Sequence, residues 1–354
     1  MFSNQLETKY NYNIDFLRIS AMLMVVVLHV ARTSGALALS TEVCFHGKIW
    51  SNIWEALSIY AVNIYALITG YLCINKKWRP DRFVILYTVV LFYQVGIYGL
   101  YYICTGNYPD PLMNLFPTCG PYWYVNAYFP LFFSIPFINI LIININKKQH
   151  LYLLLMFIVC LCLFSFNGGP QLAQNGHNYV WLCVMYVFGA YIKLYPPDFS
   201  SKLCFALFIL CAVTAFIILL MRGNWEYLYF RLYTSPVVLC GAIFFFLSVI
   251  KLQFRDSRIL YIARKTSPLT FSVYLIHCHP IIWQSMHKYL TIFGILVDYA
   301  WWYIPAVSIA LFIVCLLIDS CRLYIFNLLK LEKISALVTT KAQQGIDQII
   351  KRII

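Results

Sequence analysis

An arginine and a histidine lie eleven residues apart in an otherwise apolar segment, DFLRISAMLMVVVLH, which runs from Asp15 to His29. In an α-helix this separation gives about 16 Å of rise and about 1100° of rotation, so Arg18 and His29 share one helix face at opposite depths. Ionisable side chains inside a bilayer are costly and usually functional. Arg18 can alternatively extend to lipid headgroups beside Asp15, and His29 can be a hydrogen-bonded packing residue. We favour a functional role for His29 and leave both interpretations of Arg18 open.

A carboxylate and further polar side chains occur in other apolar segments. Glu55, in NIWEALSIY, is expected at the depth of His29, where it could orient the imidazole and stabilise its protonated form, as a general base requires. A carboxylate that faces an aqueous vestibule explains the same position equally well. In TFSVYLIHCHPII, Tyr274, His277 and His279 occupy positions where apolar residues would cost less.

The sequence indicates no metal site. His277 and His279 are two positions apart and face different sides of a helix, so they do not form a metal-binding pair. The 13 cysteines form no CxxC pair and no His/Cys cluster with metal spacing, so we interpret them as small apolar core residues. Cys44 and Cys119 both fall in predicted outer loops and could form a disulfide.

Two kinds of loop could bind ligands. INKKWRPDRF places four cations within seven positions, and Arg79 and Arg82 are spaced to hold one phosphorylated ligand through forked hydrogen bonds. The alternative is that these cations only keep the loop on the cytoplasmic side of the membrane and bind no ligand. The loops TGNYPDPLMNLFPTCGPYW and NGGPQLAQNGHN are rich in Pro, Gly, Asn and aromatic residues. They suit a neutral polar ligand such as a sugar, although turn chemistry alone also explains them.

The elements that must position these residues are membrane-spanning helices. The 354-residue chain is 62% hydrophobic and 11% charged, with a mean hydropathy of +0.74, which excludes an ordinary soluble domain. Segments of about 20 apolar residues can cross a bilayer as helices. We therefore predict an all-α, polytopic membrane protein with about ten transmembrane helices, at residues 14–31, 53–73, 83–104, 122–143, 151–166, 179–194, 203–221, 233–250, 269–290 and 301–321.

Basic residues set the predicted orientation. With the N-terminus in the cytoplasm, most of the 26 Lys and Arg residues fall on the inner side, so both termini are expected there. This distribution attributes the net charge of +13 to a cytoplasmic membrane face rather than to nucleic-acid binding. The first apolar run has no cleavage pattern of a signal peptide. We predict a transmembrane domain at 1–328 and a cytoplasmic tail at 329–354, in which IDQIIKRII forms an amphipathic helix on the inner leaflet.

The first half of the chain resembles the acyltransferase-3 family of bacterial integral membrane O-acyltransferases. DFLRISA is similar to its D-x-L-R opening, and Arg18 and His29 match its Arg, ten residues, His pattern. IYALITGYL resembles the S-G-Y/F-L second span, with Thr69 in place of the usual Ser. Arg79 and Arg82 match an R-x-x-R motif in the following cytoplasmic loop.

The resemblance continues into the second half. GPYWYVNAYF, which contains Trp123, is similar to a Trp-containing segment before the fourth span of the family. FSVYLIHCHPII resembles a late Y-L-I-H-x-P motif, but here Cys278 and an additional His279 separate His277 from Pro280. Each motif is weak by itself, and the set becomes specific through its order and spacing.

The resemblance implies transfer of an acetyl or larger acyl group from cytoplasmic acetyl-CoA to a hydroxyl of a surface polysaccharide or lipid-linked oligosaccharide, at the outer side of the bacterial inner membrane. His29 would be the base or a transient acyl carrier, with Glu55 as its catalytic partner. The other expected site residues are Arg18, Arg79 and Arg82 for the coenzyme phosphates and Trp123, Tyr274 and His277 for the acceptor. Membrane lipids are expected partners, nucleic acid is not, and a homodimer is left open.

A different class of protein remains as the alternative. A transporter or flippase for a lipid-linked saccharide would also contain intramembrane ionisable residues along its pathway. The sequence has no convincing internal repeat of the kind such transporters often show. A membrane sensor or assembly subunit without turnover is a third and weaker alternative.

Overall fold

The protein is predominantly helical in the part that its structure, a computed structural model, describes: residues 10–34, 45–107, 112–164, 173–220, 232–253, 258–292 and 299–353. The principal helices are α1 (Tyr12–Thr33), α2 (Phe45–Ser58), α3 (Ala61–Cys73), α4 (Pro80–Thr105), α5 (Trp123–Ile143), α6 (Lys147–Phe157), α7 (Tyr179–Leu194), α8 (Ser201–Leu220), α10 (Pro236–Ile250), α11 (Arg258–Thr266), α12 (Thr270–His277), α13 (Pro280–Ile292), α14 (Ala300–Leu328) and α15 (Leu331–Ile353). No strand occurs in these ranges, which confirms the predicted all-α class.

Six helical segments are long and apolar enough to cross a membrane. They are α1, α4, α5, α8, α14 and the range Ile49–Cys73, which comprises most of α2 and all of α3. The helices α7 and α10 are apolar but shorter. The chain is therefore a multi-pass membrane protein. The count of ten spans and the cytoplasmic position of both termini stay predictions.

The predicted span at 269–290 is divided into two helices. α12 ends at His277, and α13 begins at Pro280, whose ring and missing N–H are tolerated at a first helical position but not inside a helix. The Tyr122 hydroxyl donates a hydrogen bond of 2.6 Å to the Leu275 carbonyl near the end of α12. Irregular backbone in a membrane protein must be satisfied by other protein groups in this way. The break places His277 and Cys278 at a helix end.

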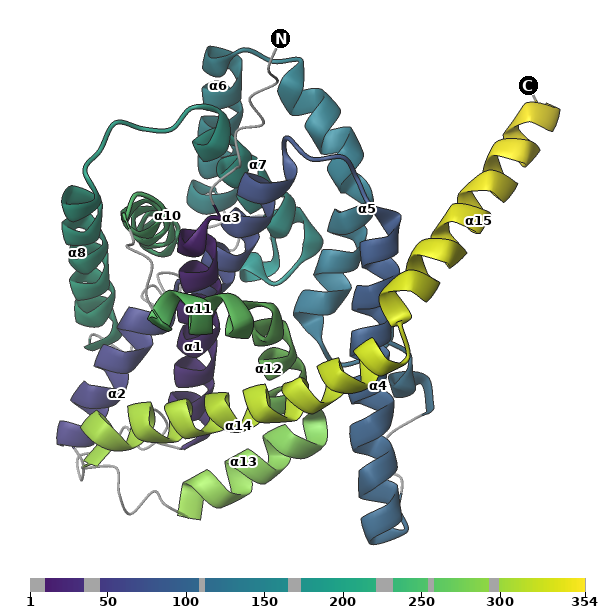
Figure 1. The fold of residues 1–354 in the computed structure, drawn as a ribbon. Helices are drawn as coiled ribbons and strands as arrows, with labels where there is room; N and C mark the ends of the chain where they lie inside the picture. Colours follow the sequence, from purple (N-terminus) through teal and green to yellow (C-terminus); the bar gives the residue numbers. More distant parts are fainter. Residues whose placement is uncertain are drawn as a thin grey trace.

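Helix α1 is at the centre of the packing. It contacts α2, α3, α10, α11, α12, α13 and α14, and Figure 1 shows it in purple among them. The helix α3 beside it packs closely on α7 through two glycines. A Cβ at Gly70 would lie 2.0 Å from the Tyr186 carbonyl oxygen, and one at Gly189 would lie 2.2 Å from that of Leu67. Any larger residue at either position would force these backbones apart.

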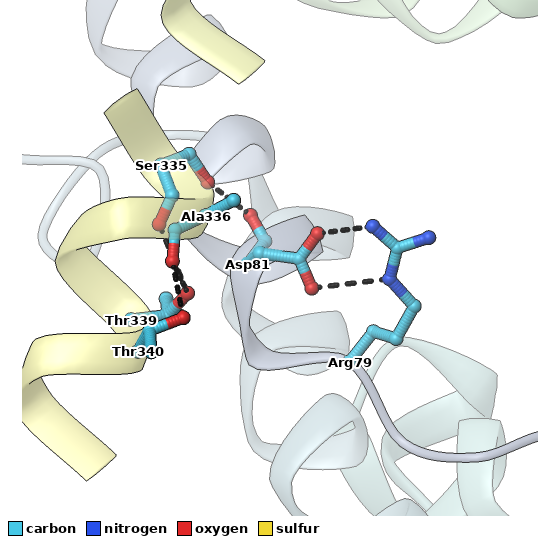
Figure 2. A network of polar contacts seen from close by, with 6 residues as sticks. All are labelled: Arg79, Asp81, Ser335, Ala336, Thr339 and Thr340. Atoms are coloured by element: carbon cyan, nitrogen blue, oxygen red, sulfur yellow. Dashed lines mark hydrogen bonds and ion pairs between the residues drawn. The ribbon is translucent and has the colours of Figure 1, made fainter. Parts of the chain in front are cut away.

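The chain ends in a long helix that packs against the start of α4. α14 stops at Leu328, Lys330 adopts a positive φ of 51°, and α15 then continues in a new direction (Figure 1, yellow). Figure 2 shows the contact: the Ser335 hydroxyl of α15 donates a 2.7 Å hydrogen bond to the Asp81 carbonyl. Helical structure thus extends through the predicted tail, whose position on the inner leaflet stays a prediction.

Candidate active site

Two histidines from distant parts of the chain meet between α1 and α12. His29 belongs to α1 and His277 is the last residue of α12, and His29 Nδ1 lies 2.9 Å from His277 Nε2. His277 Nδ1 lies 2.5 Å from the Val273 carbonyl oxygen. A carbonyl only accepts, so Nδ1 of His277 carries a proton and, in the neutral ring, its Nε2 is an acceptor. It follows that His29 donates from Nδ1 and keeps an unprotonated Nε2, the form that a general base requires.

A cysteine and a tryptophan complete the surroundings of this pair. Cys278 Sγ lies 3.4 Å from His29 Nδ1 and 3.3 Å from His277 Nε2. The Trp283 ring packs edge-on against His29, with 5.0 Å between ring centroids. The sulfur and the two nitrogens lie within 4.8 Å of one another, a grouping that spacing along the chain did not reveal. His279 takes no part in this group of three.

A large cavity, here called the basic cavity, opens beside the other end of α1. Its volume is about 700 Å³, and its polar lining comes from Asp15, Arg18, Tyr65, Thr69, Lys76, Arg82, Tyr124, Tyr128, Ser267 and Thr270. Arg18, Lys76 and Arg82 are positively charged, which suits a phosphorylated ligand. Asp15 is only 2% exposed, and its Oδ2 has no hydrogen-bond partner among the described residues. Tyr10 and Asn11 also line the cavity, and the Tyr10 hydroxyl interacts with the Asp15 carboxyl group. The basic cavity therefore offers three cations and one buried carboxylate.

A second and much smaller cavity, here called the histidine cavity, lies at His29. Its volume is about 40 Å³, and its lining includes His29, Trp123, Tyr233 and Tyr274. Three residues line both cavities: Tyr65, Tyr124 and Phe271. The Tyr65 hydroxyl lies 3.0 Å from both the Arg18 carbonyl oxygen and Thr270 Oγ1, so this wall is tied to α1 and to α12. These three aromatic side chains thus form a wall common to the cavity that holds the cations and the cavity that holds His29.

Three aromatic rings gather beside the histidine cavity. His177, just before α7, lies 4.7 Å from the Trp123 ring and 4.8 Å from the Tyr233 ring, centroid to centroid. Trp123 and Tyr233 are nearly parallel, with an interplanar angle of 21°. Burial lowers the pKa of His177, and the nearby Arg32 cation lowers it further. The loop that carries His177 was predicted from its sequence as a possible ligand-binding loop, but no sequence pattern indicated a role for Tyr233.

The remaining predicted residues lie in different surroundings. The fully buried Glu55 carboxylate is 3.6 Å from the Arg32 guanidinium, while His29 Nδ1 is contacted by His277. Arg79 does not line the basic cavity, and its guanidinium holds the Asp81 carboxylate at 2.5 and 3.2 Å (Figure 2).

The structure does not address the predicted disulfide. Cys44 lies outside the described residues. Cys119 is exposed, and whether it pairs with Cys44 stays open.

The fold and the site define a multi-pass membrane protein with a buried histidine pair next to a basic cavity. A family model described as an acyltransferase domain, that of the acyltransferase-3 family, matches residues 11–319. The chain belongs to this family, as its motifs suggested, and the membership supports membrane O-acyltransferase activity. No curated protein and no solved structure matches the chain.

Proposed function

We propose that this protein moves an acetyl or related acyl group from cytoplasmic acyl-CoA to a hydroxyl of a surface polysaccharide or lipid-linked oligosaccharide, on the outer side of a bacterial inner membrane. The observation that carries the proposal is the pair of adjoining cavities. One holds the cations, the other holds His29, and they share the walls formed by Tyr65, Tyr124 and Phe271.

The basic cavity matches the chemistry of a nucleotide thioester. Arg18, Lys76 and Arg82 would bind the phosphates of the donor. Asp15 Oδ2, a buried acceptor without a partner among the described residues, would take an N–H group, such as the amine of an adenine base. The pantetheine arm, long, thin and largely uncharged, would extend between the shared aromatic walls toward His29.

The opposite end of the site suits a sugar. Flat aromatic rings such as Trp123 and Tyr233 combine a large apolar face with a polar edge, which matches the apolar face and hydroxyls of a pyranose. Tyr274 lines the same cavity, so a sugar on these rings would be near His29. The Nε2 of His29 would then remove the hydroxyl proton as the oxygen attacks the acyl carbonyl. His277 would hold the reactive tautomer in place.

The decisive experiment is a reconstituted transfer assay. The purified protein in lipid vesicles is given labelled acetyl-CoA and glycans prepared from a host lacking this chain, and the ester product is measured by mass spectrometry. We expect transfer by the wild type, a loss of about 10²–10⁴-fold for His29→Ala, and wild-type activity for His287→Gln, a change at an exposed histidine of α13. Wild-type activity of His29→Ala would refute the proposed role of His29. Movement of a lipid-linked glycan across the vesicle without ester formation would instead identify a flippase.

A further inference from the structure

The transfer just described leaves one reactive side chain without a role. Cys278 contacts both imidazoles of the histidine pair, at 3.4 and 3.3 Å, and it lies in the short break between α12 and α13. It is also one of the two residues that separate His277 from Pro280. The thiol therefore contacts both members of the histidine pair, in addition to packing against the surrounding apolar side chains.

The surroundings of Cys278 have the arrangement of an activated nucleophile. Such sites place a base within reach of the nucleophile and a third group that orients the base. Here the base is His277 Nε2, and the orienting group is the Val273 carbonyl, which fixes the proton on Nδ1. His29 Nδ1–H donates to His277 Nε2 in the resting pair, and it can shift this hydrogen bond to the sulfur, 3.4 Å away, when His277 has taken the thiol proton. Cys278 is partly exposed, whereas His277 is fully buried behind it.

The cavities place this thiol where an acyl group would arrive. His29, which is in contact with Cys278, lines the histidine cavity, and that cavity shares three aromatic walls with the basic cavity. An acyl donor held by the cations would enter from one side, and a sugar on the Trp123 ring would enter from the other. A carrier between them removes the need for both substrates to be bound in reacting geometry at the same moment.

We propose that Cys278 is the transient acyl carrier, so that the reaction passes through a Cys278 thioester; this inference rests on the proposed acyltransferase function. In the first step the Cys278 S–H proton moves to His277 Nε2, and the thiolate attacks the carbonyl carbon of acyl-CoA. A new C–S bond forms as the bond to the coenzyme sulfur breaks, and the departing coenzyme thiolate takes the proton from His277.

The second step transfers the acyl group to oxygen. The acceptor oxygen attacks the Cys278 thioester while His29 Nε2 removes the hydroxyl proton. The C–S bond breaks, and the Cys278 sulfur takes the proton from His29 Nδ1, 3.4 Å away. The proton that His29 gained at Nε2 then returns to Nδ1 by exchange with water, which restores the resting histidine pair. Both steps only exchange an acyl group between sulfur, sulfur and oxygen, so no oxidant or reductant is needed. The products are free coenzyme A and the glycan ester.

The test separates the two half-reactions. Full-length protein in lipid nanodiscs is incubated with acetyl-CoA alone, and peptides are analysed by mass spectrometry. We expect an acetyl group on Cys278 that hydroxylamine removes at neutral pH and that added glycan discharges after the coenzyme has been washed away. Cys278→Ala should lose this adduct and more than about a hundredfold of the transfer rate. Cys183→Ala, a change at a partly buried cysteine of α7, should lose neither.

Several results would overturn the inference. These are full transfer by Cys278→Ala, an acetyl group found on His29 in place of Cys278, or a stoichiometric metal ion that is lost in Cys278→Ala, since a metal-bound thiolate would not be an acyl carrier. Binding of coenzyme A to Cys278→Ala monitors its folding. Full transfer by Cys278→Ala leaves the acyltransferase function intact, whereas absence of transfer by the wild type would refute that function itself.

Discussion

Two arginines that look equivalent in the sequence should differ sharply in donor binding. Arg82 lines the basic cavity, whereas Arg79, three residues earlier, does not line it and is engaged with Asp81. Figure 2 shows the Arg79 guanidinium turned toward that carboxylate. Both belong to the same short segment at the start of α4, and both are exposed. The pair Arg82→Ala and Arg79→Ala is therefore a matched comparison in which mainly the access to the cavity differs.

The expected magnitude follows from the bond that Arg82 would make. A hydrogen bond to a charged group contributes about 1.5–3 kcal/mol, and each 1.4 kcal/mol changes an equilibrium constant about tenfold. Arg82→Ala should therefore weaken coenzyme A binding roughly 10- to 100-fold. Arg79→Ala removes only the exposed contact with Asp81, so the coenzyme affinity should stay within about twofold of the wild type.

Isothermal titration of coenzyme A into protein in nanodiscs measures both affinities directly. Titrations at two salt concentrations add a second criterion, because the wild type should lose affinity with salt more steeply than Arg82→Ala. Equal losses for the two variants would show that the basic cavity does not hold the phosphates. A larger loss for Arg79→Ala would mean that the donor lies on the α4–α15 face instead.

Two further predictions concern packing and pH. Gly70→Ala should lower the Tm and the yield of folded protein, because the new Cβ would meet the Tyr186 backbone and overpacking costs about 1–3 kcal/mol. The control variant Gly96→Ala, which has open space around the new Cβ, should be neutral or stabilising. Equal Tm values for the two variants would contradict the close approach of α3 and α7. The pKa of His177 is lowered by burial and by Arg32. Just below pH 6.5, His177 is therefore protonated in the unfolded chain but stays neutral in the folded chain. Its stabilising contribution is complete above pH 6.5 and is lost as the pH falls through the lower folded-state value. The Tm should therefore fall between pH 7.5 and 5.5, and less steeply in His177→Gln; identical slopes would rule out this origin of the acid sensitivity.

Helical periodicity and hydropathy were enough to predict some of these features. The all-α class follows from apolar segments of membrane length, and the eleven-residue spacing correctly indicated that Arg18 and His29 face one continuous side of α1. In the structure that side borders the basic cavity at Arg18 and the histidine cavity at His29. The relative positions of two side chains on one helix can be predicted from the sequence, because the helical repeat fixes the rise and rotation between them.

Contacts between helices could not be predicted in this way. His29 and His277 are 248 positions apart, and they meet because α12, which ends at His277, packs against α1. Depth alone suggested Glu55 as the partner of His29, and this role stays a prediction; rotation about the helix axis also decides which side chains meet, and the Glu55 carboxylate lies 3.6 Å from the Arg32 guanidinium. The glycine of the ITGYL motif, Gly70, was read only as part of a pattern, and its role in close helix packing became visible with α7 in place.

The shared wall of Tyr65, Tyr124 and Phe271 also has an electrical consequence. An enzyme that joins a donor on one side of a membrane to an acceptor on the other must not let ions follow the acyl group, since each charge that crosses 100 mV releases about 2.3 kcal/mol of stored energy. A water-filled passage between Arg18 and His29 would dissipate the membrane potential even when no acyl group is being transferred. In the proposed function, the three bulky aromatic side chains that line both cavities would keep such a passage closed to water and would have to rotate aside for the uncharged thioester arm. If the proposed transfer across the membrane is correct, replacing all three by alanine should therefore open a path for protons.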